Sequence, residues 1–84
     1  MAVVTITPDA LKQAEHLPAS IRARMRRLTL RLARWPEVSG VKPLSGNLAG
    51  RYRMRTGDYR LQFHVQGDNV IVEKIGHRDR FYED

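Results

Sequence analysis

The segment 51–66 constrains the fold of this chain more than any other part of the sequence. Tyr52 and Met54 alternate with arginines, the turn residues 56–58 follow, and a second alternating run continues to residue 66. A period of two is the side-chain period of a β-strand, and a short turn between two such runs indicates a β-hairpin. One face of this hairpin is therefore predicted to be apolar, with Tyr52, Met54, Leu61 and Phe63, and the other to be rich in arginine.

A helical hairpin is expected before this segment. Thr7 supplies a capping hydroxyl and Pro8 fits the first helical position, so one helix is predicted from Pro8 to about residue 16. After a proline turn, a second helix is predicted to run to Arg34 or Trp35. The expected apolar stripes are Ala10, Leu11, Ala14 and Leu17 on the first helix, and Ile21, Met25, Leu28, Leu32 and Trp35 on the second.

The remaining segments complete a small α+β fold. Residues 3–6 and 70–75 are predicted strands, and residues 37–50 are a predicted loop. The last strand alternates imperfectly, so we expect it inside the sheet with apolar contacts on both faces. The 84 residues suffice for one modest core, which predicts a single domain over 1–84. Its expected order is an N-terminal strand, a helical hairpin and an antiparallel three-stranded meander, with the helices on one sheet face.

The charge of the chain points to a class of partner. Fifteen basic residues against nine acidic ones give a net charge of +6. Three of the fifteen are the lysines 12, 42 and 74, so 15 − 3 = 12 are arginines. Arginine grips phosphate with paired hydrogen bonds and stacks on bases, which favours nucleic acid. A generic basic surface, or an arginine-rich codon usage, would give the same composition.

Several chemistries and locations are excluded or disfavoured. The chain has no cysteine, which excludes a disulfide framework, a thiolate zinc site and a cysteine nucleophile. The three histidines are scattered, so neither a metal site nor a cofactor is expected. No apolar run approaches the ~18 residues of a membrane span, and the first residues lack the pattern of a signal peptide. We therefore expect a cytoplasmic protein.

The arginines fall into two groups. Arg53, Arg55 and Arg60, together with His64, are expected on the polar face of the hairpin. Like charges opposite each other across strands cost some tenths of a kcal/mol to about 1 kcal/mol, which a bound polyanion would offset. The alternative is a solvated basic face. The arginines of the second helix are either a solvated flank or a patch facing the ribosome; they are Arg22, Arg24, Arg26, Arg27, Arg31 and Arg34.

The segment 76–82 adds the other reactive side chains. His77 and Tyr82 are candidates for proton transfer, and Arg78 is a candidate phosphate ligand. RNA brings its own nucleophile, the ribose 2′-hydroxyl. A protein can therefore cleave RNA without metal or cofactor, by aligning this hydroxyl with the phosphate and stabilising the developing charge.

Three motifs, in this order and spacing, resemble the RelE/ParE toxin superfamily, and most closely its RelE branch of messenger-RNA endonucleases. The resemblance covers essentially the whole chain. It implies the toxin of a type II toxin–antitoxin system that enters the ribosomal A site and cleaves messenger RNA by 2′-hydroxyl attack. The motifs are Arg51-Tyr52-Arg53-Met54-Arg55, Gly57-Asp58-Tyr59-Arg60-Leu61, and Gly76-His77-Arg78 with Tyr82 four residues later.

The resemblance also implies roles for single residues. Arg53 and Arg55 stand where the family places basic residues, usually lysine, that contact RNA and assist proton transfer. Arg60 and Arg78 match its phosphate-stabilising arginines, and Tyr82 matches the tyrosine that orients and stacks the substrate.

Further residues complete the predicted site. Arg51, His64 and Arg80 are assigned to RNA binding. A guanidinium is a poor base, so His77 or His64 is the better candidate for a general base, unless catalysis relies mainly on positioning.

The implied partners are an antitoxin and the translating ribosome. The antitoxin is expected to be small and acidic, and the toxin–antitoxin complex to bind operator DNA. A ParE-like toxin that inhibits DNA gyrase without nuclease activity is the main alternative, and Tyr82 favours the nuclease. A nucleic-acid-binding protein without toxicity is a third possibility.

Overall fold

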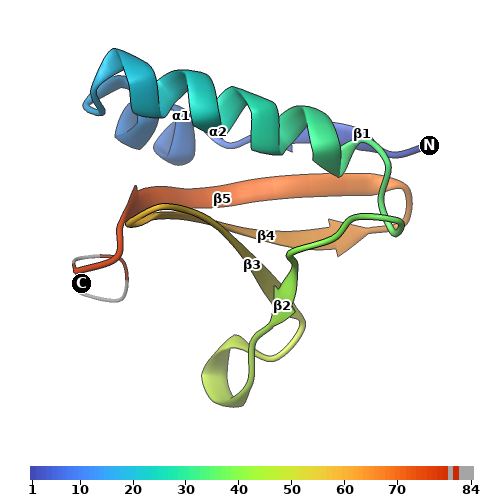
Figure 1. The fold of residues 1–84 in the computed structure, drawn as a ribbon. Helices are drawn as coiled ribbons and strands as arrows, with labels where there is room; N and C mark the ends of the chain where they lie inside the picture. The colour runs from blue at the N-terminus through green and yellow to red at the C-terminus, as the bar shows by residue number, and fades with distance from the viewer. Residues whose placement is uncertain (80, 82–84) are drawn as a thin grey trace.

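The fold is a five-stranded mixed sheet with two helices packed on one face (Figure 1). The computed structural model describes residues 1–79 and 81. The sheet order is β1-β5-β4-β3-β2, in which β1 is parallel to β5 and the other neighbours are antiparallel. The predicted α+β arrangement is confirmed. Its elements are β1 (Val3–Ile6), α1 (Pro8–Glu15), α2 (Ala19–Leu32), β2 (Lys42–Pro43), the 3₁₀-helix η1 (Gly46–Leu48), β3 (Arg51–Thr56), β4 (Tyr59–Gln66) and β5 (Asn69–His77).

The helices begin and pack largely as the sequence predicts. The Thr7 hydroxyl accepts a hydrogen bond from the Ala10 amide at 3.1 Å, and Pro8 is the first residue of α1. Helix α2 ends at Leu32, earlier than the predicted Arg34 or Trp35. The chain leaves the helix there in turns, and the Trp35 ring packs on the aromatic rings of the sheet beneath.

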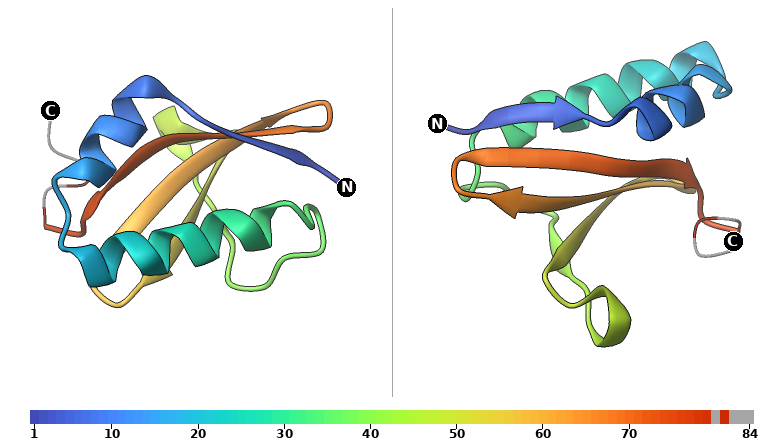
Figure 2. Two further views of the ribbon diagram at one scale, coloured as in Figure 1. Left: turned by 90° about the horizontal axis from the view of Figure 1, so that it is seen from above. Right: turned by 180° about the vertical axis from the view of Figure 1, so that it is seen from behind.

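The core lies between the helices and the sheet (Figure 2). The expected stripe on α2 is confirmed. On α1 the prediction was wrong at Leu11, which is 53% exposed because it lines an open cleft between the two helices. The buried side chains of α2 and the meander are Met25, Leu28, Leu32, Met54, Leu61, Phe63, Val70, Val72 and Ile75.

Strand β5 contains a β-bulge at Glu73. Val72 pairs with Phe63 and Lys74 pairs with the adjacent Gln62, so Glu73 is an extra residue in β5. The bulge returns Ile75 to the core face. The strand is interior, as predicted. Ile71 is a half-buried apolar residue on the face opposite Val70 and Val72, and the bulge accounts for the break between Val72 and Ile75.

The segment predicted as a loop forms a fifth strand. Strand β2 pairs with β3, with Lys42 opposite Arg53, and η1 follows it. Figure 1 shows this segment extending away from the helices. Neither described helix is long and apolar enough to cross a membrane.

Candidate nucleic-acid interface

The sheet face opposite α1 and α2 carries most of the predicted site residues, and we call it the open face. Strand alternation puts Arg53, Arg55, Arg60 and His64 there, on the side away from the buried Met54 and Leu61. Lys42 joins them from β2, since it pairs with Arg53. Across the strands, the rows of this face are Arg55–Arg60–Gly76, Lys42–Arg53–Gln62–Lys74 and Arg51–His64–Ile71.

One end of the open face has arginine nitrogens that lack a hydrogen-bond acceptor. Arg55 lies directly opposite Arg60. The Nε atoms of Arg53 and Arg60 are buried and have no hydrogen-bond partner among the described residues. A buried donor without an acceptor costs roughly 1–3 kcal/mol, and more when it is charged. This end of the face is therefore suited to an anion that supplies the missing acceptors.

The other end of the open face is neutralised by Glu73. Its Oε1 accepts from Arg51 Nε at 2.8 Å and from Gln62 Nε2 at 3.2 Å, and its Oε2 lies 3.4 Å from His64 Nδ1. The histidine contact is too poorly aligned to count as a hydrogen bond, so it is an electrostatic contact between neighbours.

Sequence reasoning missed Glu73. The available signal was the position of this acidic residue directly after the apolar run 70–72, where it interrupts the alternation.

The end of β5 is held against the β3–β4 turn. The Arg78 amide donates to the Asp58 carbonyl at 2.7 Å, and Arg78 Nε lies 3.7 Å from an Asp58 carboxylate oxygen. Because Gly76 pairs with Arg60, Arg78 lies just beyond the row that contains Arg55 and Arg60. The structure therefore brings Arg78 to the same end of the sheet as those two arginines.

His77 is not on the open face. It pairs with Tyr59, and the two rings meet edge to face with centroids 5.1 Å apart on the helix side of the sheet. Its Nδ1 accepts a hydrogen bond from the Asp79 amide at 3.2 Å. The neutral ring therefore carries its proton on Nε2, which makes that nitrogen a donor and not an acceptor.

Phe81 packs on the open face at the end of the sheet that carries Gly76. Phe81 is 1% exposed, and a Cβ atom added to Gly76 would lie 3.7 Å from its ring. Lys74 Nζ lies 5.0 Å from the centroid of the same ring. Arg80 and Tyr82, two predicted site residues, lie outside the described residues.

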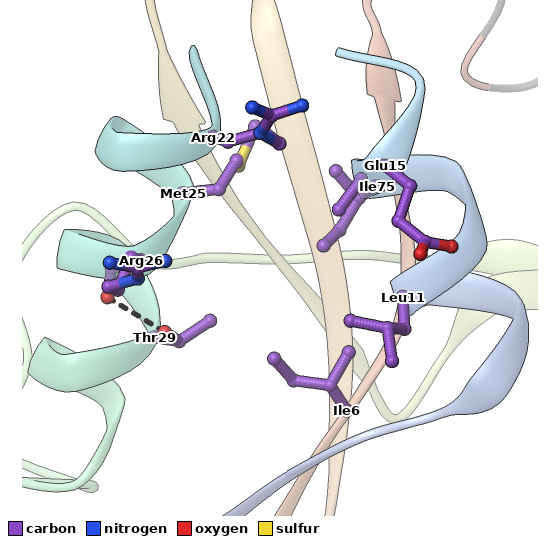
Figure 3. A pocket seen from close by; sticks show the side chains of 9 residues that line it. Ile6, Leu11, Glu15, Arg22, Met25, Arg26, Thr29 and Ile75 are labelled. Carbon is purple, nitrogen blue, oxygen red and sulfur yellow. Dashed lines mark hydrogen bonds between the residues drawn. The ribbon is translucent and has the colours of Figure 1, made fainter. Parts of the chain in front are cut away.

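The opposite side of the molecule has a cleft between α1 and α2 (Figure 3). Its volume is about 190 Å³, and apolar side chains such as Leu11 and Met25 line it, with Arg22 and Arg26 on the α2 side. Arg31 instead donates to the Ser39 carbonyl at 2.6 Å, so at least one α2 arginine has a structural role.

Within residues 1–79 and 81, no group of three or more histidine, aspartate or glutamate side chains is placed to hold a metal ion.

A known family of toxins matches nearly the whole chain. The model of the family described as the ParE toxin of type II toxin–antitoxin systems, parDE, matches residues 4–82. The chain therefore belongs to this family of type II toxins, within the RelE/ParE superfamily.

The more particular likeness is to RelE proteins. Toxin RelE3 of Methanocaldococcus jannaschii is 28% identical over 76 residues, which cover 87% of this chain and 86% of that protein. The RelBE2 toxin–antitoxin complex of Mycobacterium tuberculosis contains a chain that is 30% identical, with a TM-score of 0.81 and coverage of 92% and 98%. The RelE–RelB complex of Pyrococcus horikoshii OT3 gives 28% identity and a TM-score of 0.76, over 94% and 97% of the two chains.

Proposed function

We propose that this toxin is a ribosome-dependent endonuclease that cleaves messenger RNA in the A site. The observation that carries the proposal is the pair of buried Nε atoms of Arg53 and Arg60, which have no acceptor among the described residues. Phosphate oxygens would supply acceptors to both when the two side chains turn outward to meet the RNA, and their charge would offset the repulsion between Arg55 and Arg60. The RelE relatives support the RNA-directed branch of the superfamily.

The proposed chemistry needs no metal. The 2′-oxygen of one nucleotide forms a bond to the adjacent phosphorus while the bond from phosphorus to the 5′-oxygen breaks. The products are a 2′,3′-cyclic phosphate and a free 5′-hydroxyl. Arg60 and Arg78 stabilise the charge on the phosphate oxygens, Arg53 and Arg55 hold the RNA backbone, and Tyr82 orients the substrate.

Two protons move in this reaction, one from the 2′-hydroxyl and one to the departing 5′-oxygen. Histidine is the side chain suited to such transfers near neutral pH. His77 is a candidate for either transfer, and it lies at the end of β5 on the helix side of the sheet, not on the open face. His64 lies on the open face and is the candidate base, although its row is separated from that of Arg60 by the row of Arg53 and Gln62.

The proposed partners are a cognate antitoxin, the ribosome and, for the toxin–antitoxin complex, operator DNA. Solved relatives include complexes of RelE with RelB antitoxins. In this chain, the cleft between α1 and α2 combines an apolar floor with Arg22 and Arg26. It suits an amphipathic antitoxin helix that places carboxylates beside these arginines.

The second candidate function is gyrase inhibition without nuclease activity, and the ParE name of the matching family is the observation that favours it. Expression without an antitoxin distinguishes the two functions. Growth arrest with new messenger-RNA 5′ ends inside translated codons supports the nuclease. Growth arrest with intact messages and double-strand DNA breaks contradicts it and supports the gyrase inhibitor.

A further inference from the structure

The arginines of the open face differ in whether a carboxylate neutralises them. Arg51 Nε is 2.8 Å from Glu73, whereas Arg53 and Arg60 have buried Nε atoms without an acceptor among the described residues. Glu73 is the one carboxylate that the described parts of β2 to β5 direct onto this face. The strand residues of the face are therefore divided into a neutralised end at Arg51 and a cationic end at Arg53, Arg55 and Arg60. Arg78, beyond the last row, lies near the carboxylates of Asp58 and Asp79.

The division depends on the bulge. Glu73 is the extra residue of β5, and its half-buried side chain, 19% exposed, contacts groups from the neighbouring strand β4 and from β3 beyond it. Arg51 comes from β3, and Gln62 and His64 come from β4. These three side chains fix the carboxylate within the sheet face, where its negative charge neutralises the Arg51 guanidinium.

The two ends are far enough apart to contact different nucleotides. Arg51 and Arg55 lie four residues apart on β3. At a rise of about 3.3 Å per residue, their rows are separated by roughly 13 Å. An RNA strand that runs along the face therefore meets strong phosphate ligands at one end and a neutral network at the other.

We propose that Glu73 is a specificity-determining residue that keeps Arg51 from holding the RNA backbone. It thereby limits the phosphate-binding track to the unpaired arginines Arg53, Arg55 and Arg60. This inference rests on the proposed RNA-directed function and revises the expectation that Arg51 binds RNA. Backbone contacts scale with the number of unpaired cations and do not depend on sequence. A short track therefore limits the binding of free single-stranded RNA and leaves selection of the substrate to the ribosome.

The test measures binding of an uncleavable 2′-O-methyl RNA oligonucleotide as a function of salt concentration. Glu73→Gln removes the neutralising charge and keeps the shape of the side chain. It is expected to bind more tightly, with a salt dependence steeper by about 0.7 in log–log slope for each phosphate gained. Glu37→Gln makes the same charge change at an exposed residue outside the sheet, and is expected to keep the wild-type slope.

A charge-neutral double variant, Arg51→Gln with Glu73→Gln, checks that the gain passes through Arg51. It is expected to return to the wild-type affinity and slope, whereas Arg53→Gln is expected to lower both. Thermal unfolding verifies that each variant is folded. If Glu73→Gln behaves like Glu37→Gln, or if the double variant loses as much affinity as Arg53→Gln, the inference is overturned while the RNA site stands. If Arg53→Gln itself has no effect, the proposed RNA site fails, and this inference fails with it.

Discussion

Arg55 and Arg60 lie directly opposite each other in the β3–β4 hairpin, on the sheet face that neither described helix covers. Like charges in this arrangement destabilise a sheet by roughly 0.2–1 kcal/mol. Arg55→Thr, which keeps a residue suited to a strand, is therefore expected to raise the free energy of unfolding by about that amount in urea titrations. The same variant is expected to weaken RNA binding, because it removes a cation from the track.

The control for this prediction is Arg27→Ala on the exposed surface of α2. It also removes one positive charge, but its stability is expected to change by less than about 0.5 kcal/mol. If Arg55→Thr is less stable than the wild type, the repulsion argument is wrong. If it binds RNA equally well, Arg55 is not part of the RNA site.

The start of α1 depends on one side-chain hydrogen bond. Thr7 accepts from the Ala10 amide at 3.1 Å, and Ala10 is fully buried against the core. Thr7→Ala is expected to lower the free energy of unfolding by about 1 kcal/mol, while Thr7→Ser retains the hydroxyl and most of the stability. Chemical denaturation of both variants makes the comparison, and equal losses would show that the hydroxyl is not the cause.

Phe81 packs on the open face. Its ring is 1% exposed and lies against Gly76 and Lys74, outside the main core cluster. Phe81→Ala is expected to cost about 3–5 kcal/mol, in the range of buried aromatic residues. Because Phe81 directly precedes Tyr82 in the sequence, RNA cleavage is expected to fall as well.

Gly76→Ala is the matched variant for this contact. The added Cβ would lie 3.7 Å from the Phe81 ring, which is an ordinary van der Waals distance. Its stability is expected to remain within about 1 kcal/mol of the wild type. A large loss from Gly76→Ala, or none from Phe81→Ala, would contradict the described packing of Phe81.

The proposed role of His77 in proton transfer predicts a change in the pH dependence of cleavage. Glutamine cannot transfer a proton, so His77→Gln is expected to be slower than the wild type and to give a pH–rate profile of a different shape. Single-turnover cleavage measured across pH makes the test. A His77→Gln profile of unchanged shape would remove His77 from the reaction, and the same series with His64→Gln examines the candidate base.

Most of the fold follows from local patterns in the sequence. Alternation between residues 51 and 66 predicts which side of the hairpin is buried, and the burial of Met54, Leu61 and Phe63 confirms it. Strand β2 was not predictable in the same way. It has two residues, one of them proline, and exists only because it pairs with β3.

The site was only partly predictable for a similar reason. Arg53, Arg55 and Arg60 could be placed together because a hairpin fixes its own register. The bulge at Glu73 depends on pairing between β4 and β5, and it determines both the network with Arg51 and the face on which His77 lies. A single residue inserted in a strand reverses every later side chain, and alternation alone does not locate that residue.

We propose that this protein cleaves messenger RNA on the ribosome and that the arginines of its open face stabilise the reacting phosphate. The most direct measurement uses purified protein, ribosomes stalled with a defined codon in the A site, and mapping of the RNA ends. With the wild-type protein we expect a cut within that codon, with a cyclic phosphate and a 5′-hydroxyl at the new ends. The cut is expected to be about 100-fold slower or worse in Arg60→Ala and to persist in Arg27→Ala. An intact message with the wild-type protein, or undiminished cleavage by Arg60→Ala, would contradict the account.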